Sequence, residues 1–122
     1  MQNPDLTDEQ RAVLFSKSTE APFSGALLTE SRDGDYLCAN CGSKLFDSST
    51  KFEAHCGWPS FDRSIDGAVN YIEDDSHGMQ RTEVVCANCG GHLGHVFDDG
   101  PQETTGQRYC INSLSMSFAK HD

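Results

Sequence analysis

The sequence predicts a single, small, mostly β domain of antiparallel strands. Its 122 residues suffice for one modest core, so we expect one domain over residues 1–122. From residue 36 onward, short stretches alternate with Gly, Pro, Asn and Asp, which is typical of short strands joined by turns. The brief connections favour antiparallel pairing. The chain shows no alternation of strands with helices and no phosphate-binding glycine loop, so folds that bind nucleotide cofactors are disfavoured.

One short helix is expected near the N-terminus. A Thr-Asp-Glu-Gln sequence has the pattern of a capping box, in which Thr7 caps the helix and Gln10 reaches back to it. Helix-forming residues then continue to about Lys17. The apolar residues of this helix are contiguous, so the sequence does not determine which face packs. Residues 20–25 predict an extended linker with a turn at Gly25.

Seven strands are expected in the rest of the chain. They are divided by Gly, Pro, Asn and Asp, the residues that favour turns. The strands cover residues 36–38, 44–46, 68–73, 82–86, 93–97, 108–112 and 115–119.

The charge of the chain limits its partners. It carries 19 acidic and 9 basic side chains, a formal net charge of −10. This balance repels phosphate backbones and anionic lipid surfaces, so nucleic acids and membranes are poor candidates. No apolar run approaches membrane-spanning length, and residues 1–10 lack the features of a secretory signal. We therefore expect a cytoplasmic protein, in which paired cysteines more often bind metal or catalyse redox reactions than form structural disulfides.

A repeated motif predicts a metal site. The sequence Cys-Ala-Asn-Cys-Gly occurs at residues 38–42 and again at residues 86–90. In each CxxC turn the two sulfurs can point at one centre, so two such turns predict a closed tetrahedral site for one structural zinc ion. The expected ligands are Cys38, Cys41, Cys86 and Cys89. Because residues 43–85 separate the motifs, zinc would clamp distant parts of the chain together.

Other assignments of these cysteines are open. Two independent CxxC redox pairs, or surface cysteines without a joint role, also fit the spacing. A set of Cys86, Cys89, His92 and His95 would crowd the metal and leave the first motif unexplained. The duplicated spacing favours the four-cysteine site.

Two cysteines, Cys56 and Cys110, lie outside the repeat, and two spare thiols in a small domain suggest redox chemistry. A strand over residues 108–112 would turn Tyr109 and Ile111 to the core, and its polar side chains would line an opening. Those polar-face residues are Arg108, Cys110 and Asn112. A guanidinium and an amide beside the Cys110 thiol favour its thiolate, the form that attacks. The alternative is that Cys110 is a small, buried apolar residue.

Two histidines and the only tryptophan complete the candidate site. Either His92 or His95 could donate a proton, although lone histidines are more often structural or solvated. Trp58 lies two residues after Cys56 and is either core packing or an aromatic wall for a ligand. Two spare thiols, a proton donor and an aromatic wall indicate attack on an oxidised substrate, followed by discharge of the attacking thiol as a disulfide.

The motifs that hold these residues resemble the methionine-R-sulfoxide reductase family, the B type of methionine sulfoxide reductases (MsrB). The resemblance runs from about Leu6 to Lys120. The similar strings are YLCANCGSKLFDSSTKF, CGWPSF, HGMQRTEV, the second CANCG, HLGHVFDDGP and RYCINS. It implies two antiparallel sheets with short N-terminal helices, and zinc on the CxxC turns away from the active site. It also implies reduction of methionine-R-sulfoxide, free or in oxidised proteins.

The same resemblance implies roles for single residues. Cys110 is implied to attack the sulfoxide sulfur and become a sulfenic acid while methionine leaves. Cys56 is implied to resolve it as a Cys56–Cys110 disulfide, which thioredoxin reduces. His95 and Asn112 fall where the family places polar groups around the sulfoxide oxygen. The other implied substrate contacts are Trp58, His92 and Arg108.

These implied roles also account for epimer selectivity. Thiolate attack on sulfur requires the departing oxygen to be protonated, so a donor such as His95 accelerates the step. A methyl group on Trp58 and an oxygen among donors would fix the handedness of the sulfur, which selects the R epimer.

Two stretches depart from the family pattern. Residues 102–107 are about one residue longer than expected and lack a proline, and residues 53–55 read Glu-Ala-His where small residues are common. Neither stretch contains a proposed catalytic residue. Two rival functions fit fewer of these features: a zinc-clamped binding module without chemistry, and a general disulfide oxidoreductase whose active pair is a CxxC.

Overall fold

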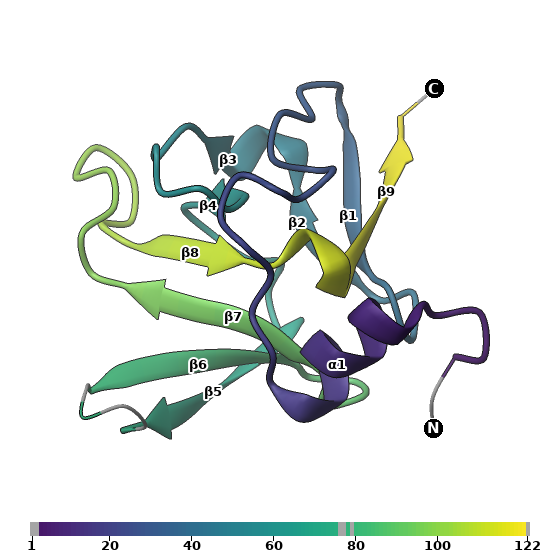
Figure 1. The fold of residues 1–122 in the computed structure, drawn as a ribbon. Helices are drawn as coiled ribbons and strands as arrows, with labels where there is room; N and C mark the ends of the chain where they lie inside the picture. The colour runs from purple at the N-terminus through teal and green to yellow at the C-terminus, as the bar shows by residue number, and fades with distance from the viewer. Residues whose placement is uncertain (1–2, 76–77, 79, 122) are drawn as a thin grey trace.

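Two antiparallel β-sheets and one α-helix make up the part of the chain that the computed structural model describes, residues 3–75, 78 and 80–121 (Figure 1). The helix is α1 (Asp8–Ser16). The strands are β1 (Gly34–Cys38), β2 (Lys44–Asp47), β3 (Lys51–Phe52), β4 (Ser60–Phe61), β5 (Val69–Asp74), β6 (Arg81–Cys86), β7 (His92–Phe97), β8 (Arg108–Ile111) and β9 (Met116–Lys120). The predicted mostly β fold of two antiparallel sheets is confirmed.

An aromatic core joins the two sheets, which have the strand orders β3-β4-β8-β7-β6-β5 and β2-β1-β9. Phe46 of β2 stacks on Phe61 of β4 with ring centroids 4.2 Å apart, and Tyr36 of β1 meets the Phe61 ring edge-on at 5.0 Å. All three side chains are fully buried. The short 3₁₀ helix η3 (Ser113–Ser115) carries the chain from β8 in the larger sheet to β9 in the smaller one.

The helix begins at the predicted capping box. The Thr7 side chain accepts a hydrogen bond from the Gln10 N–H, and the Gln10 side chain accepts one from the Thr7 N–H. The helix ends at Lys17, whose left-handed backbone (φ 58°) stops it. Val13 and Leu14 are the buried residues of α1, which answers the question of the packed face. Of the short N-terminal helices that the resemblance implies, the described residues contain this one.

All seven predicted strands are present, and their ends lie within two residues of the predicted ones. The strands β3 and β4 were not predicted, because two residues are too few to show an alternating pattern. They nevertheless matter for the site: β4 pairs with both β3 and β8, and so brings the loop before β4 next to β8.

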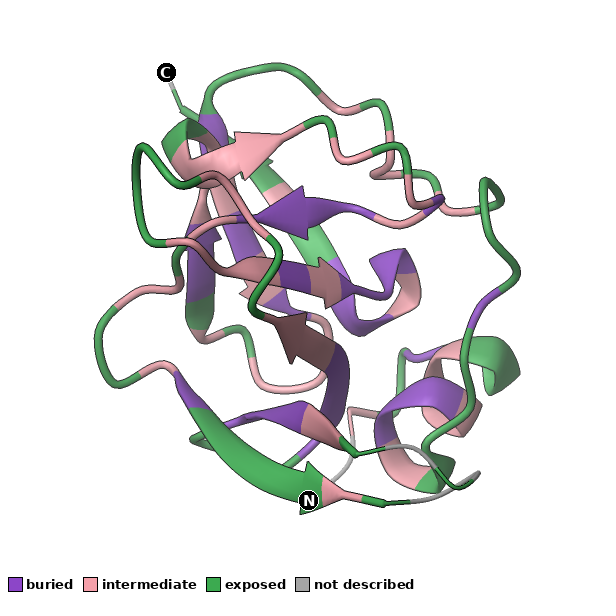
Figure 2. Ribbon diagram, turned by 90° about the vertical axis from the view of Figure 1, so that its left-hand side faces the viewer, coloured by how far each residue is buried: buried purple, intermediate pink, exposed green. Residues whose placement is uncertain are grey.

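Burial follows the position of a strand in the larger sheet. The edge strand β5 is exposed over most of its length, whereas β6 to β8 have largely buried or half-buried residues (Figure 2). Among the described residues, no helix has the length and apolarity that a membrane crossing requires.

Candidate functional site

The two spare thiols lie side by side. Cys110 is in the middle of β8, where Ser60 of β4 and His95 of β7 are its cross-strand partners. The Cys56 Sγ atom lies 3.4 Å from the Cys110 Sγ atom and 3.2 Å from the Ser60 Oγ atom. The sulfurs would therefore need to approach by little more than 1 Å to reach a disulfide bond length of about 2 Å.

The backbone of the loop before β4 brings Cys56 to this position. His55 and Gly57 both have left-handed backbone angles, with φ 57° and 95°. A Cβ atom at Gly57 would lie 2.7 Å from the Cβ atom of Pro22, so this close approach requires glycine. The two left-handed residues on either side of Cys56 form the sharp turn that holds it.

A cavity of about 260 Å³ contains both thiols in its wall. Six of the seven predicted non-metal site residues line it: Cys56, Trp58, His95, Arg108, Cys110 and Asn112. Tyr109 and Ile111 are buried on the opposite face of β8, as the period of two predicted. Trp58 is half-buried and forms part of the wall, with its indole N–H donating to the Glu20 carbonyl at 3.0 Å. Cys110 is accordingly not enclosed in an apolar core.

The two thiols differ in their acidity. The pKa of Cys110 is raised to about 12, mainly by burial and also by the adjacent Cys56, whereas Arg108 opposes both effects. Burial also acts to raise the pKa of Cys56, but hydrogen bonds with the Ser60 hydroxyl and the Trp58 backbone outweigh it, and the pKa falls below its usual value. Arg108 therefore favours the Cys110 thiolate, as predicted, but burial exceeds this effect.

Asn112 is fixed by hydrogen bonds that do not involve the thiol. Its side-chain amide donates to the Leu93 carbonyl at 3.0 Å, and its side-chain oxygen accepts the Glu20 N–H at 3.0 Å. Asn112 is 3% exposed. An amide nitrogen carries two N–H groups, so one donor remains for a ligand in the cavity.

His95 is oriented by a carboxylate. Its Nε2 atom lies 2.8 Å from the Oδ2 atom of Asp74, the last residue of β5. Arg81 lines the same cavity and lies 3.4 Å from that carboxylate. His95 faces Cys110 across the β7–β8 pair, so an imidazole and a thiol share one face of the sheet.

His92 lies outside this cavity lining. Its Nδ1 atom lies 2.7 Å from the Glu83 Oε2 atom, and both residues are buried. The Lys17 ammonium contacts the other Glu83 oxygen at 3.1 Å. Burial lowers the pKa of His92. Its ring centroid is 5.6 Å from that of His95, so His92 packs beside the cavity residue and does not itself line the cavity.

Arg108 is held by an acid and an aromatic ring. Its guanidinium makes two hydrogen bonds to Asp99, at 2.9 and 3.2 Å, and lies 4.5 Å from the centroid of the Phe97 ring. The Asp99 carboxylate raises the pKa of Arg108 above its usual range. The cavity therefore has a fixed positive charge at one side.

Four further cavity residues were not predicted: Thr19, Arg81, Gly94 and Phe97. The period of two along residues 93–97 could have placed Phe97 on the face of His95. Gly94 has a steric reason, because a Cβ atom there would lie 2.0 Å from the Cys110 carbonyl oxygen. In the HGMQRTEV motif, the His77 and Met79 positions lie outside the described residues.

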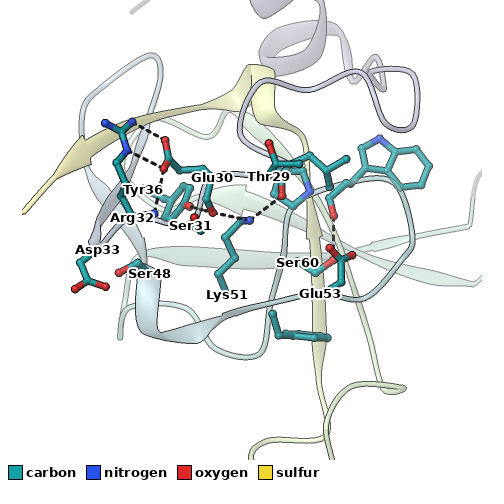
Figure 3. A pocket seen from close by; sticks show the side chains of 14 residues that line it. Thr29, Glu30, Ser31, Arg32, Asp33, Tyr36, Ser48, Lys51, Glu53 and Ser60 are labelled. Carbon is teal, nitrogen blue, oxygen red and sulfur yellow. Dashed lines mark hydrogen bonds and ion pairs between the residues drawn. The ribbon is translucent and has the colours of Figure 1, made fainter.

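A second cavity, of about 290 Å³, adjoins the first at Trp58, which lines both (Figure 3). The Lys51 ammonium donates to the carbonyls of Leu28 and Glu30 at 2.8 and 3.0 Å, and the Arg32 guanidinium pairs with the Glu30 carboxylate. The lining of this cavity contains no thiol and no imidazole. The smaller cavity is therefore the one suited to redox chemistry.

The four repeat cysteines converge at a separate place. Cys38 and Cys89 have Sγ atoms 3.7 Å apart, and Cys41 and Cys86 have Sγ atoms 3.6 Å apart. All four sulfurs lie within 4.8 Å of one another. Four thiolates around zinc at about 2.3 Å would have S···S distances of ~3.8 Å, so these residues fit the ion. The four-cysteine set is the one that the structure brings together.

The alternative ligand set does not form. His92 and His95 are bonded to Glu83 and Asp74, and neither belongs to the cysteine cluster. Gly42 and Gly90, which follow the two CxxC turns, have nearly equal left-handed φ angles of 78° and 79°. The repeated sequence therefore folds into a repeated turn.

Comparison with known proteins agrees with this geometry. A family model described as the SelR domain matches residues 6–120. A peptide methionine sulfoxide reductase MsrB of Methanosarcina mazei is 57% identical over 118 residues, which cover 96% of this chain and 84% of that protein. The proteins of the same name from Alteromonas mediterranea and Leptospira interrogans are 56% and 55% identical, over 97% and 95% of this chain and 83% and 88% of their own.

A solved structure shares the fold at low sequence identity. The Mis18 "Yippee-like" domain superposes with a TM-score of 0.56 at 14% identity, over 75% of this chain and 99% of that one. This likeness concerns the fold alone. The family match and the high identity to its named members decide the relationship: the chain belongs to the SelR family, the MsrB type of methionine sulfoxide reductases, which are oxidoreductases.

Proposed function

We propose that residues 1–122 form one reductase domain that converts methionine-R-sulfoxide, free or in oxidised proteins, to methionine. The observation that carries this proposal is the pair of thiols 3.4 Å apart in the wall of a cavity, with an imidazole, a guanidinium and an indole around them. The family relationship supplies the substrate class. The four-cysteine cluster binds one structural zinc ion.

In the first step, Cys110 attacks the sulfoxide sulfur. The oxygen leaves the substrate sulfur and ends on Cys110 as a sulfenic acid, while methionine is released. Arg108 is the group that opposes the effect of burial on the Cys110 pKa, so it stabilises the attacking thiolate. His95, oriented by Asp74, donates a proton to the departing oxygen.

In the second step, Cys56 attacks the sulfenic sulfur. A Cys56–Cys110 disulfide forms and water leaves. The lowered pKa of Cys56 favours its thiolate, the form that this attack needs. Two thiols of thioredoxin then reduce the disulfide, so that thioredoxin is oxidised and both cysteines return to thiols.

The cavity walls select the epimer. The substrate methyl group packs on Trp58, and the oxygen faces His95 and the remaining N–H of Asn112. His92 supports His95 from outside the cavity. Only one handedness at sulfur satisfies both contacts together, and we assign it to the R epimer.

The zinc site has a structural role. Cys38 and Cys86 end β1 and β6, which belong to different sheets. When bound, zinc joins these two strand ends with a closed set of four sulfur ligands, which leaves no open position for a substrate. The ion therefore stabilises the fold and takes no part in the redox steps. The free thiols that the proposed cycle needs are consistent with the reducing cytoplasm.

An epimer-resolved assay tests the proposal. Purified protein is incubated with either sulfoxide epimer and with dithiothreitol or thioredoxin. We expect the R epimer to be consumed far faster than the S epimer, and turnover to be lost in Cys110→Ser with zinc content unchanged. A Cys110→Ser variant that still turns over, or equal consumption of both epimers, contradicts the proposal.

A further inference from the structure

Glu20 lies outside both cavities, yet its backbone contacts two residues of the proposed substrate site. Its carbonyl accepts the indole N–H of Trp58 at 3.0 Å, and its N–H donates to the side-chain oxygen of Asn112 at 3.0 Å. Trp58 is on the loop before β4, and Asn112 follows β8. A single residue therefore spans the two walls of the cavity.

The Glu20 carboxylate fixes the position of this backbone. Glu20 is 7% exposed, and its Oε1 atom accepts the Leu114 N–H at 2.9 Å. Leu114 lies in η3, directly after Asn112, so the carboxylate ties residue 20 to the element that carries one of its two backbone contacts. An N–H in the first turn of a helix has no partner within that helix, which is the reason that an acceptor is needed at this place.

The buried Glu20 carboxylate occupies a space that is left free by Gly25. Its Oε2 atom has no hydrogen-bond partner among the described residues. Burying an unpaired polar atom costs folding free energy, and an apolar residue at this position would avoid that cost. A Cβ atom at Gly25 would lie 2.4 Å from Oε2 and 2.1 Å from the Ser113 Oγ atom. Glycine at this position leaves the space that the buried acid occupies.

The segment of residues 17–25 is also fixed on both sides of Glu20. It leaves α1, crosses β7 in the view of Figure 1, and passes the end of β8, where the Glu20 N–H donates to Asn112. Lys17 contacts the buried Glu83 at 3.1 Å, and the Phe23 N–H donates to the Gly57 carbonyl at 2.7 Å. Thr19 lines the cavity itself. A change in the position of residue 20 would therefore move the cavity walls instead of being absorbed by the segment.

We propose that Glu20 is a positioning residue that sets the epimer selectivity of the site. Its carboxylate holds the residue 20 backbone, and that backbone sets the indole of Trp58 relative to the amide of Asn112. Since these two groups face the methyl group and the oxygen of the substrate, their relative position decides which handedness at sulfur fits. This inference rests on the proposed function for its substrate and on the described contacts for its geometry.

Three substitutions of Glu20 separate the length of its side chain, which brings an acceptor to the Leu114 N–H, from its negative charge. Glu20→Gln keeps an oxygen acceptor at the same distance from the Leu114 N–H and removes the charge. Glu20→Asp keeps the charge and is one methylene too short, and Glu20→Ala removes the acceptor. Thr7→Ala is the matched control, because it removes the side-chain acceptor of a backbone N–H at α1 and contacts neither Trp58 nor Asn112.

The readouts are Trp58 fluorescence and the ratio of kcat/KM for the two epimers. Trp58 is the only tryptophan, so emission reports on this indole alone. We expect Glu20→Ala and Glu20→Asp to change the emission spectrum and to lower the R-to-S ratio by about tenfold. Glu20→Gln and Thr7→Ala should stay within about twofold of the wild type. Glu20→Asp keeps the test available if Glu20→Ala does not fold.

Two results would overturn the inference. One is a Glu20→Asp protein with wild-type emission and wild-type epimer ratio. The other is a Glu20→Gln protein as impaired as Glu20→Asp, which would show that an oxygen acceptor at the same distance from the Leu114 N–H does not position the site. Emission does not depend on turnover, so a wild-type protein that reduces neither epimer would refute the proposed function while the spectra still test the positioning by Glu20.

Discussion

The two groups of cysteines have nearly the same sulfur spacing and very different surroundings. In the four-cysteine cluster the paired sulfurs lie 3.6 and 3.7 Å apart, and in the Cys56–Cys110 pair they lie 3.4 Å apart. The cluster is formed by four sulfurs that converge on one another, whereas the pair opens onto a cavity with an imidazole, a guanidinium and an indole. The environment of a thiol, more than its distance to the next one, therefore indicates its chemistry.

The two groups also differ in how the chain assembles them. Each half of the cluster is a local turn, formed by a motif of five residues. The pair is assembled by pairing of β4 with β8, which joins residues far apart in the sequence. The cluster should accordingly control folding, and the pair should control turnover.

Removal of the metal tests whether the four-cysteine cluster controls folding, and it should have the largest effect on stability of the changes considered. Binding free energies of structural zinc sites are about 10 kcal/mol or more, and part of this becomes folding free energy. We expect complete chelation to lower the melting temperature by more than about 15 °C. The measurement is thermal unfolding by circular dichroism, with metal content determined in parallel.

A Cys110→Ser protein is the matched control for metal removal, since it loses a thiol but keeps the cluster. Its melting temperature should stay within a few degrees of the wild type, about 5 °C or less. Unchanged melting of the metal-free protein would contradict a structural role for zinc.

Cys56→Ser tests the turnover half of the comparison. The nucleophile remains, so one sulfoxide should be reduced per protein molecule without a reductant. Cycling driven by thioredoxin should be lost, because the disulfide that it reduces cannot form. Rapid-mixing assays of methionine formation measure the first result, and steady-state thioredoxin oxidation measures the second. Normal thioredoxin turnover by Cys56→Ser would remove Cys56 from the resolving role.

The pH dependence of alkylation should show the smallest effect. The folded pKa of Cys56 is lowered and that of Cys110 is raised to about 12. As the pH rises, Cys56 should therefore become reactive first, below its usual pKa, and Cys110 only well above it. The measurement is the rate of iodoacetamide labelling against pH, with each labelled peptide identified by mass.

Single substitutions sharpen this result in opposite directions. Cys56 raises the pKa of Cys110, so Cys56→Ser should lower the pH at which Cys110 reacts. Cys110 helps to lower the pKa of Cys56, so Cys110→Ser should raise the pH at which Cys56 reacts. Equal labelling of both thiols at every pH would contradict the difference in their environments.

The sign of the linked stability follows from the same shifts. The lowered pKa of Cys56 adds stability at pH values above its unfolded pKa, and this is lost as pH falls through the folded value. The raised pKa of Cys110 leaves stability intact below its unfolded pKa and removes it as pH rises toward about 12. Raising the pH therefore increases the contribution of Cys56 to the stability of the fold and decreases the contribution of Cys110.

Local signals were sufficient for much of the fold. The capping box at Thr7 located α1, and the two CxxC turns identified the four cysteines that converge and could hold a metal ion, because each signal lies within a few consecutive residues. The alternation along β8 correctly separated its core face from its cavity face. Strands β3 and β4 could not be predicted, because two residues carry too little pattern.

Contacts between residues far apart in the chain could not be predicted from the sequence. Asp74 and Asp99 orient His95 and Arg108 across strand pairs or loops, and nothing in the local pattern marks either acid as a partner. The raised pKa of Cys110 could not be predicted for a related reason. Its polar neighbours are visible in the sequence, but the burial that outweighs them arises only from the folded cavity.

In the proposed cycle Cys110 and Cys56 are the redox pair, while the four repeat cysteines only hold zinc. One measurement tests it directly: wild-type protein is treated with methionine-R-sulfoxide without reductant, and its cysteine linkages are mapped by mass spectrometry. We expect a Cys56–Cys110 disulfide, with the four repeat cysteines still present as zinc-bound thiolates. A disulfide within either CxxC turn, formed as methionine is released, would contradict it.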